Sequence, residues 1–315
     1  MRVVLCLDRR NRRPYKFFYD SLVEFYKSHG YEARQVRLIN PNLYADVMAL
    51  NPDVCVIWNG YSSTYSDHVQ KLRKTGMKLV FHEIAWFPQS ETMYIDSNGM
   101  LGDAIKEEIP SNYDKSAWEK QRAEYLNEVS SLYTTSRQAL DKRIVCRPNG
   151  KLPNDFILVP GQLERDISTR HFSKIHTMQK LVDLVARFLP DEKIVYRAHP
   201  VDRDQKLKLP KNVTVINDTP LYETINKAKV VVGINSTVLL ESLLLRKPTF
   251  AFGDGVWSVH PGTVIKIRPK DLREAIGNYT DNQIADDFIR HLFNIQIRMK
   301  DAKFNERNRR TLLND

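Results

Sequence analysis

Short apolar runs alternate with amphipathic stretches along most of the chain. In the first half, β-branched and apolar runs at 2–7, 53–58 and 77–81 predict strands, and the stretch 15–28 has the spacing of an amphipathic helix. The same alternation of strands and helices resumes at residue 156. Strands that alternate with helices form parallel sheets covered by helices, so the pattern predicts an α/β protein.

The clearest strand–turn–helix unit spans residues 226–253. A β-branched run at 229–234 predicts a buried parallel strand, and the apolar helix that follows at 238–245 ends before Lys247-Pro248. A helix that begins just past the carboxyl end of a parallel strand points free N–H groups and the positive end of its dipole toward the ligand crevice. The unit therefore predicts a phosphate site, although an ordinary crossover with a capped helix would have the same pattern.

Polar residues cluster where this helix begins. Asn235, Ser236 and Thr237 are helix-capping residue types, and their amide and hydroxyl groups suit a phosphate. Glu241 lies about a turn and a half further on and could reach a ribose or a base. A single Glu in an otherwise apolar helix calls for a reason, because an unpaired carboxylate is seldom buried.

A second signal lies upstream, where the predicted strand at 192–197 ends in Arg197-Ala198-His199-Pro200. If this strand neighbours the one at 229–234, His199 lies beside Ser236. An imidazole in that place can hydrogen-bond or protonate a departing phosphate. The alternative is a histidine that packs or caps at the end of a strand.

A third signal follows the predicted strand at 156–160. Gly161 lets the backbone turn sharply there. Polar side chains then recur at every second position and are expected in the same crevice: Gln162, Glu164, Asp166 and Ser168. Two carboxylates near an arginine are what glycosyl transfer chemistry would use, whereas the alternative is a solvated loop with a helix cap.

The strands of the first half end in groups that could contact an acceptor: Trp58, Asn59, Tyr61, His82, Glu83 and Trp86. The carboxyl ends of parallel strands meet at one edge of a sheet, so these groups are expected to lie together. The aromatic rings could stack on a sugar or a base, and Glu83 is the best candidate for the base that takes a proton from an acceptor hydroxyl. Core or rim aromatics and a carboxylate paired with a neighbour are the alternatives.

The net charge of +10, with an isoelectric point near 9.4, favours an acidic partner such as nucleic acid, an anionic glycan or the inner leaflet of a membrane. Part of that charge is concentrated directly after the first predicted strand, in Arg9, Arg10, Arg12 and Arg13. In a doubly wound domain this loop opens into the ligand crevice, and guanidinium groups bind phosphates and carboxylates in a bidentate manner. An anionic acceptor is therefore expected here, with a solvated surface loop as the alternative.

Composition narrows the class of protein. A chain of 315 residues with 42% hydrophobic and 27% charged residues suits a soluble protein of two domains. No stretch approaches the ~18 apolar residues of a membrane span, and the chain begins with a strand in place of a secretory signal. We therefore expect a cytoplasmic protein, for which a peripheral contact with the inner membrane is compatible with the basic charge.

The cysteines and acidic pairs of the sequence do not have the pattern of a metal-binding site. The three cysteines are far apart, and they are most simply reduced thiols. Asp202-Arg203-Asp204 has the spacing of a metal-binding pair but lies in a Lys-rich loop, where solvated charge is the better interpretation. No metal and no other cofactor is expected.

A linker at 147–153, rich in Pro, Gly and basic residues, suggests where the chain divides. We expect one domain at 1–150, a second domain at 151–285, and a C-terminal helix and tail at 286–315. Residues 88–112 lack periodicity and are expected to form a long cleft loop. The tail from Asn305 is expected to fray.

The motifs that end the strands of the second half, in this order, resemble the capsule polysaccharide biosynthesis proteins, which include the retaining bacterial β-Kdo transferases. The resemblance rests on Val159-Pro160-Gly161-Gln162 with Asp166-Ile167-Ser168, on Arg197-Ala198-His199-Pro200, and on Asn235-Ser236-Thr237 with Glu241 and Lys247-Pro248. It implies a GT-B fold, in which two Rossmann-like domains face a central cleft and a C-terminal helix crosses back. It also implies a nucleotide-sugar donor, which is CMP-Kdo in the best-known members. The resemblance makes 1–150 the acceptor-binding domain and 151–285 the nucleotide-sugar-binding domain.

By this resemblance, Asp166 takes the place of the catalytic carboxylate, His199 and Ser236 those of the phosphate contacts, and Glu241 that of a nucleoside contact. Where the family often has a more acidic stretch after its Gln, this chain has Glu164-Arg165-Asp166, so the donor sugar stays open. Glu83 or Glu164 would assist proton transfer.

Three functions are compatible with these features. The first is a glycosyltransferase that acts on a surface glycan or its lipid-linked base. The second is a phage-type transferase that glycosylates a base of duplex DNA held by the arginine loop, for which a steep loss of affinity with salt is expected. The third is a non-catalytic nucleotide-binding module, which would be indifferent to Asp166→Asn. The sequence leaves the oligomeric state open.

Overall fold

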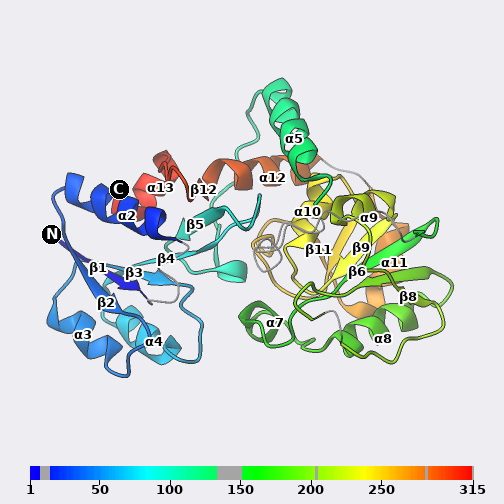
Figure 1. The fold of residues 1–315 in the computed structure, drawn as a ribbon, viewed down its shortest axis with the longest axis horizontal. Coiled ribbons are helices and arrows are strands. Elements are labelled where there is room, and N and C mark those ends of the chain that lie inside the picture. The colour runs from blue at the N-terminus through cyan, green and yellow to red at the C-terminus, as the bar shows by residue number, and fades with distance from the viewer. Residues whose placement is uncertain (8–14, 133–150, 203–204, 281–282, 314–315) are drawn as a thin grey trace. The chain divides into compact units, whose positions relative to one another are not determined.

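A computed structural model describes residues 1–7, 15–132, 151–202, 205–280 and 283–313 of the chain (Figure 1). Its contacts divide the protein into two compact units. Unit 1 comprises Met1–Lys106 and Ile295–Asp315, and unit 2 comprises Glu107–Asn294. Within the described ranges, each unit contains one six-stranded sheet. The chain returns to unit 1 at its C-terminal end, in agreement with the expected segment that crosses back.

The sheet of unit 1 has the strand order β12-β5-β4-β3-β1-β2. Its strands are β1 (Arg2–Leu7), β2 (Glu32–Arg37), β3 (Val54–Trp58), β4 (Lys78–Ile84), β5 (Thr92–Asp96) and β12 (Ile297–Arg298). The first four are parallel, whereas β5 is antiparallel to both β4 and β12. Because β1 pairs with β2 on one side and β3 on the other, the strand order reverses between β1 and β3, where ligands of such sheets bind.

Helices cover both faces of this sheet. They are α2 (Lys16–Ser28), α3 (Leu43–Ala49), α4 (Ser66–Lys74), the 3-10 turn η1 (Leu101–Asp103) and α13 (Glu306–Leu313). Helix α2 buries Phe18, Tyr19, Leu22 and Tyr26, whose spacing forms one stripe, and the Tyr26 hydroxyl donates to the carbonyl of Leu312 in α13. Figure 1 shows α3 and α4 on the opposite face.

The sheet of unit 2 is parallel throughout, in the order β11-β10-β9-β6-β7-β8. Its strands are β6 (Phe156–Pro160), β7 (Lys193–Arg197), β8 (Val213–Val215), β9 (Val230–Gly233), β10 (Thr249–Ala251) and β11 (Ile265–Lys266). Numbered within the unit, this is the doubly wound order 3-2-1-4-5-6, with its switch point between β6 and β9. The central strands are buried on both faces, which explains their continuous apolar runs.

The helices of unit 2 are α5 (Lys115–Val129), α7 (Ile167–His171), α8 (Met178–Phe188), α9 (Leu221–Lys227), α10 (Val238–Leu244), the 3-10 turn η2 (Pro269–Asp271), α11 (Leu272–Gly277) and α12 (Gln283–Ile295). Helices α8 and α11 share a core with β6 and β7, in which Val182 and Leu272 pack with Ile157 and Tyr196. Helices α9 and α10 cover the other face (Figure 1).

Helix α5 shows why unit 2 begins earlier than residue 150. Its Trp118 and Tyr125 pack edge-on against Phe293, and Tyr125 also contacts Tyr222, so the helix shares the core of unit 2. The predicted boundary itself lies within residues 133–150, outside the described part of the chain.

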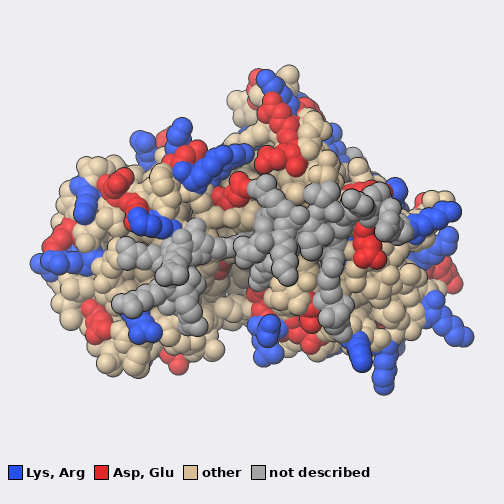
Figure 2. All heavy atoms as spheres, viewed as in Figure 1, with Lys and Arg blue, Asp and Glu red and all other residues tan. Residues whose placement is uncertain are grey.

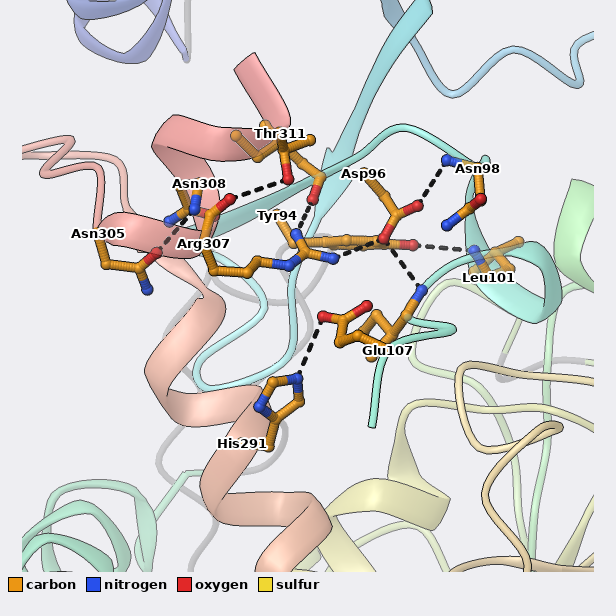
Figure 3. A network of polar contacts seen from close by, with 12 residues as sticks. Tyr94, Asp96, Asn98, Leu101, Glu107, His291, Asn305, Arg307, Asn308 and Thr311 are labelled. Carbon is orange, nitrogen blue, oxygen red and sulfur yellow. Dashed lines mark hydrogen bonds and ion pairs between the residues drawn. The ribbon is translucent and has the colours of Figure 1, made fainter. Parts of the chain in front are cut away.

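Two expectations about irregular segments were wrong. The stretch expected to be a long cleft loop contains β5, all of whose residues are buried, and a strand buried on both faces has no alternating pattern to reveal it. The tail expected to fray forms α13. Arg307 of this helix donates to the carboxylate of Asp96 and to the carbonyl of Ile95 in β5, while Leu312 is buried (Figure 3).

Within the described residues, no helix combines the length and the apolar character needed to cross a membrane. Cys6 and Cys55 are free thiols buried in neighbouring strands, with 3.5 Å between their sulfur atoms. Cys146 lies outside the described residues.

Candidate functional site

The carboxyl ends of β6, β7, β9 and β10 lie at one edge of the parallel sheet of unit 2. We call these ends, with the residues that follow them, the unit 2 edge. It contains the residues that the sequence predicted to bind the donor, which are Gln162, Ser168, Arg197, His199, Asn235, Ser236, Thr237 and Glu241, and two that it predicted to be catalytic, Glu164 and Asp166. In sheets of this topology, ligands bind at the switch point of that edge.

Gln162 and Asn235 meet at the switch point between β6 and β9. The Gln162 amide nitrogen donates to Asn235 Oδ1 at 2.9 Å, and the Asn235 backbone N–H donates to Gln162 Oε1 at 2.9 Å. Asn235 Nδ2 donates in turn to the carbonyls of Ser168 and Asp254. Both side chains are buried, so they join the loops that follow β6, β9 and β10.

Asp166 is the exposed carboxylate of this edge. It is the N-cap of α7, and its Oδ1 accepts from the backbone N–H of Ser168 at 3.0 Å and from the Ser168 hydroxyl at 3.1 Å. Its Oδ2 accepts no hydrogen bond from the described residues. One oxygen therefore fixes the carboxylate while the other is available to a ligand.

His199 is half-buried at the end of β7. Its Nδ1 accepts from the backbone N–H of Val201 at 3.2 Å, so the neutral ring has its hydrogen on Nε2. Burial lowers the pKa of His199, while the nearby carboxylates of Asp166 and Asp202 act in the opposite direction. At neutral pH the ring is therefore an uncharged donor close to Asp166.

The turn between β9 and α10 places two hydroxyls at the unit 2 edge. Ser236 Oγ accepts from the backbone N–H of Val238 at 3.3 Å. Thr237 is the N-cap residue of α10, and both residues are partly exposed. These hydroxyls can therefore donate to a ligand oxygen.

Three more of the predicted residues point into the protein. Glu241 is 2% exposed and accepts from the Tyr222 hydroxyl at 3.4 Å, so its contact with a nucleoside stays a prediction. Arg197 is 5% exposed, and its Nη1 donates to the hydroxyls of Thr219 and Thr224. Glu164 accepts from the backbone N–H of Met178 and from the side chain of Gln205.

The corresponding edge of unit 1, which we call the unit 1 edge, lies at the carboxyl ends of β3 and β4. Asn59 Nδ2 donates to Glu83 Oε2, and Asn59 Oδ1 accepts from the backbone N–H of Tyr61 at 3.0 Å. Gly60 has a φ of +91°, and a Cβ at this position would lie 2.6 Å from the Phe81 ring, so the turn requires glycine.

The Tyr61 hydroxyl donates to Asp103, a carboxylate that the sequence did not single out. Burial and this hydrogen bond raise the pKa of Tyr61. Asp103 was missed because it lies 42 positions from Tyr61, in a segment without periodicity.

His82 and Trp86 correct the predicted acceptor site. His82 has no exposed surface and packs among the rings of Phe18, Tyr19 and Trp58, and neither ring nitrogen bonds to a described residue. Burial lowers its pKa to about 3. Trp86 is 4% exposed and stacks on Tyr94 with 4.6 Å between ring centroids. Both residues belong to the core and have no surface for an acceptor.

Trp58 is partly exposed, and its ring packs on Tyr15 with 5.0 Å between centroids. Arg9, Arg10, Arg12 and Arg13 lie outside the described residues, so the basic acceptor loop stays a prediction. On the face drawn in Figure 2, the described Lys and Arg side chains are scattered among Asp and Glu and do not gather in one patch. Among the described residues, no group of three or more His, Cys, Asp or Glu could hold a metal ion.

Comparison with known proteins identifies the family. Residues 92–300 match the capsule polysaccharide biosynthesis proteins. The chain belongs to this family. It is similar to the protein FixF of Sinorhizobium fredii, with 29% identity over 213 residues that cover 65% of this chain and 50% of FixF.

It is also similar to the capsule polysaccharide export protein KpsS of Escherichia coli, with 24% identity over 135 residues that cover 38% of this chain and 35% of KpsS. The chain thus matches half or less of the length of these two relatives.

Two solved structures share the fold. The β-Kdo 2,7 transferase of Thermosulfurimonas dismutans KpsC has a TM-score of 0.61 at 19% identity, with 94% of this chain and 91% of that chain covered. The β-Kdo 2,4 transferase of the same KpsC has a TM-score of 0.59 at 14% identity, with 91% and 88% covered. The predicted GT-B fold, with two Rossmann-like halves, is therefore confirmed.

Proposed function

We propose that this protein transfers a sugar from a nucleotide-activated donor to a hydroxyl group of a surface polysaccharide or its lipid-linked base. The observation that supports the proposal best is the exposed carboxylate of Asp166, fixed through one oxygen near the neutral ring of His199. Membership in the capsule polysaccharide family supports a glycan acceptor. The two structural relatives are Kdo transferases, so a CMP-Kdo-like donor is the first to test.

In the proposed reaction, the nucleotide lies at the unit 2 edge. His199 donates from Nε2 to a phosphate oxygen, and Ser236 and Thr237 donate from their hydroxyls. The bond between the anomeric carbon and the phosphate oxygen breaks, and its electron pair leaves with the phosphate. Asp166 stabilises the positive charge that develops on the sugar, or attacks the anomeric carbon if the configuration is retained.

The acceptor is proposed to bind at the unit 1 edge. Glu83 takes the proton from the acceptor hydroxyl as that oxygen bonds to the anomeric carbon. Asn59 holds one oxygen of Glu83, and the backbone N–H of Ile84 holds the other at 2.9 Å, so the carboxylate is oriented. We propose that transfer needs no metal, because neutral hydrogen-bond donors of the protein stabilise the charge on the phosphate. Activity in the presence of EDTA tests this.

The first test is thermal stabilisation by CMP, UDP, GDP and ADP in parallel. A nucleotide at 100 times its dissociation constant stabilises the native state by about 2.7 kcal/mol, an easily measured shift. Stabilisation by CMP alone supports a Kdo-like donor, and stabilisation by UDP or GDP keeps the transferase but changes its donor. No response to any of the four would contradict the nucleotide site.

The second test is turnover with the sugar carried by the stabilising nucleotide. Glycan fragments are expected to accept the sugar, and duplex DNA serves as the alternative acceptor. Transfer to DNA, with affinity that falls steeply as salt rises, would contradict the glycan assignment.

A further inference from the structure

We propose that Glu164 is a positioning residue that acts together with Gln205 and fixes the loop bearing Asp166, and that it is not a second catalytic carboxylate. The role depends on the proposed function, because the loop matters for transfer only if Asp166 works at the anomeric centre. The loop in question is residues 161–166, between β6 and α7.

One carboxylate oxygen of Glu164 accepts two hydrogen bonds. Its Oε1 accepts from the backbone N–H of Met178 at 2.8 Å and from Gln205 Nε2 at 2.7 Å. Met178 is the first residue of α8, where backbone N–H groups have no partner within the helix. The contact therefore needs an acceptor oxygen, which a neutral amide also supplies.

Gln205 connects Glu164 back to the start of the same loop. Its Oε1 accepts from the hydroxyl of Tyr196, a buried residue of β7, at 3.3 Å. Gly161 lies against that hydroxyl so closely that a Cβ there would be 2.6 Å from it, and its N–H donates to the carbonyl of Arg197 at 2.7 Å. Both the start and the middle of the loop are thus held on β7 and α8.

A turn then separates Glu164 from Asp166. The backbone N–H of Asp166 donates to the carbonyl of Leu163 at 3.0 Å, and beyond this turn Asp166 is exposed while Glu164 is partly buried. The two carboxylates therefore have different tasks, since one is held by the protein and the other faces solvent. Placement of a reacting group matters to the rate, because an error of about 1 Å can cost about 100-fold.

The experiment compares Glu164→Gln, Glu164→Ala and Gln205→Ala with the wild-type protein. Glu164→Gln keeps an acceptor oxygen, so kcat is expected within about threefold of wild type, with an unchanged pH profile of kcat/KM. Glu164→Ala and Gln205→Ala are each expected to lower kcat about tenfold or more while the dissociation constant of the free nucleotide changes less than about threefold. Their effects should not add in the double variant.

Two results would overturn the proposal. If Glu164→Gln is as inactive as Glu164→Ala, or loses one limb of the pH profile, Glu164 is an acid or base. If Glu164→Ala and Gln205→Ala both keep the wild-type kcat, the pair positions nothing. A variant that only loses stability would lower the melting temperature and leave kcat per folded molecule unchanged, which also contradicts positioning.

Hydrogen exchange of the segment 161–178 separates this proposal from the proposed function. Faster exchange in Glu164→Ala and Gln205→Ala, with wild-type exchange in Glu164→Gln, is expected whether or not transfer is detected. Wild-type exchange in all three variants would contradict the contact itself. Absence of turnover in the wild-type protein would instead count against the proposed function. If Glu164→Ala does not fold, Gln205→Ala alone gives the answer.

Discussion

The two strand edges of this protein follow the same topological rule but use their polar residues differently. At the unit 2 edge, loops from β6, β9 and β10 are joined through Gln162 and Asn235, and Asp166 is left exposed. At the unit 1 edge, His82 and Trp86 lie in the core. A polar residue near the end of a strand is therefore a candidate for binding only if its side chain keeps exposed surface, as that of Glu83 does in β4.

The positions of the strand ends explain why His82 differs from the residues of the unit 2 edge. The predicted strand ends at 160 and 197 agree with the ends of β6 and β7, so the residues after them do enter the edge. The strand predicted at 77–81 instead continues to Ile84, and His82 pairs with Trp58 on one side and Ile95 on the other. A shift of three residues at one strand end thus converted a core histidine into an expected ligand.

The largest expected effect is that of Asp166→Asn on transfer. Asn is also a good N-cap, so α7 and the melting temperature should be preserved while kcat falls about 1000-fold or more. Steady-state kinetics and a thermal melt check both parts. An Asp166→Asn variant with wild-type turnover would contradict a catalytic role for Asp166. Nucleotide binding without turnover in either protein would support a non-catalytic binding module.

The next effect concerns stability and contrasts ion pairs of the two units. Asp96 in unit 1 is 1% exposed and accepts hydrogen bonds from Arg307, Asn98 and Ile105 (Figure 3). Asp96→Asn should therefore lower the free energy of unfolding by about 3 kcal/mol. This is the low end for breaking a buried ion pair, because Arg307 is partly exposed. Urea unfolding measures this cost.

The matched control in unit 2 is Asp191→Asn. Asp191 and its partner Arg273 are both exposed, so the cost should stay below about 1 kcal/mol. Equal costs for the two variants would show that burial does not set the strength of these pairs.

Glu83→Gln tests the unit 1 edge as an acceptor site. Loss of a general base is expected to lower kcat about 100-fold and to leave the dissociation constant of the nucleotide unchanged. Glu32→Gln, on the exposed strand β2, is the matched control and should retain wild-type turnover. A Glu83→Gln variant with full activity would mean that Glu83 is a structural carboxylate, held by Asn59 and the backbone N–H of Ile84.

The smallest expected effect is the pH dependence of stability due to His82. The pKa of its imidazole is about 3 in the native state, against an ordinary value of about 6.5, so below pH 6.5 the unfolded state binds a proton that the native state does not. Stability should therefore be complete above pH 6.5 and fall at lower pH.

Between pH 6.5 and 5, wild type should lose about 2 kcal/mol more of its unfolding free energy than His82→Phe. Urea unfolding at both pH values measures the difference. Parallel pH curves for the two proteins would mean that the ring is accessible to solvent.

Much of the fold was predictable from sequence because parallel strands buried on both faces appear as β-branched runs between amphipathic helices. Strand β5 and helix α13 could not be predicted. Strand β5 has no alternation of apolar and polar residues, and helix α13 is held by the ion pair of Arg307 with Asp96, which are 211 positions apart. For the site, sequence placed Asp166, His199 and Ser236 at one edge. It could not show that Glu164 and Arg197 point inward, because their partners are distant in sequence.

The most direct test of the central claim is hydrogen exchange with and without the nucleotide that stabilises the protein. If the nucleotide binds at the unit 2 edge, exchange should slow in segments 161–168, 197–201 and 233–241, and stay unchanged in segments 58–61 and 82–86. Slower exchange confined to the segments of unit 1, with none at 233–241, would contradict the account.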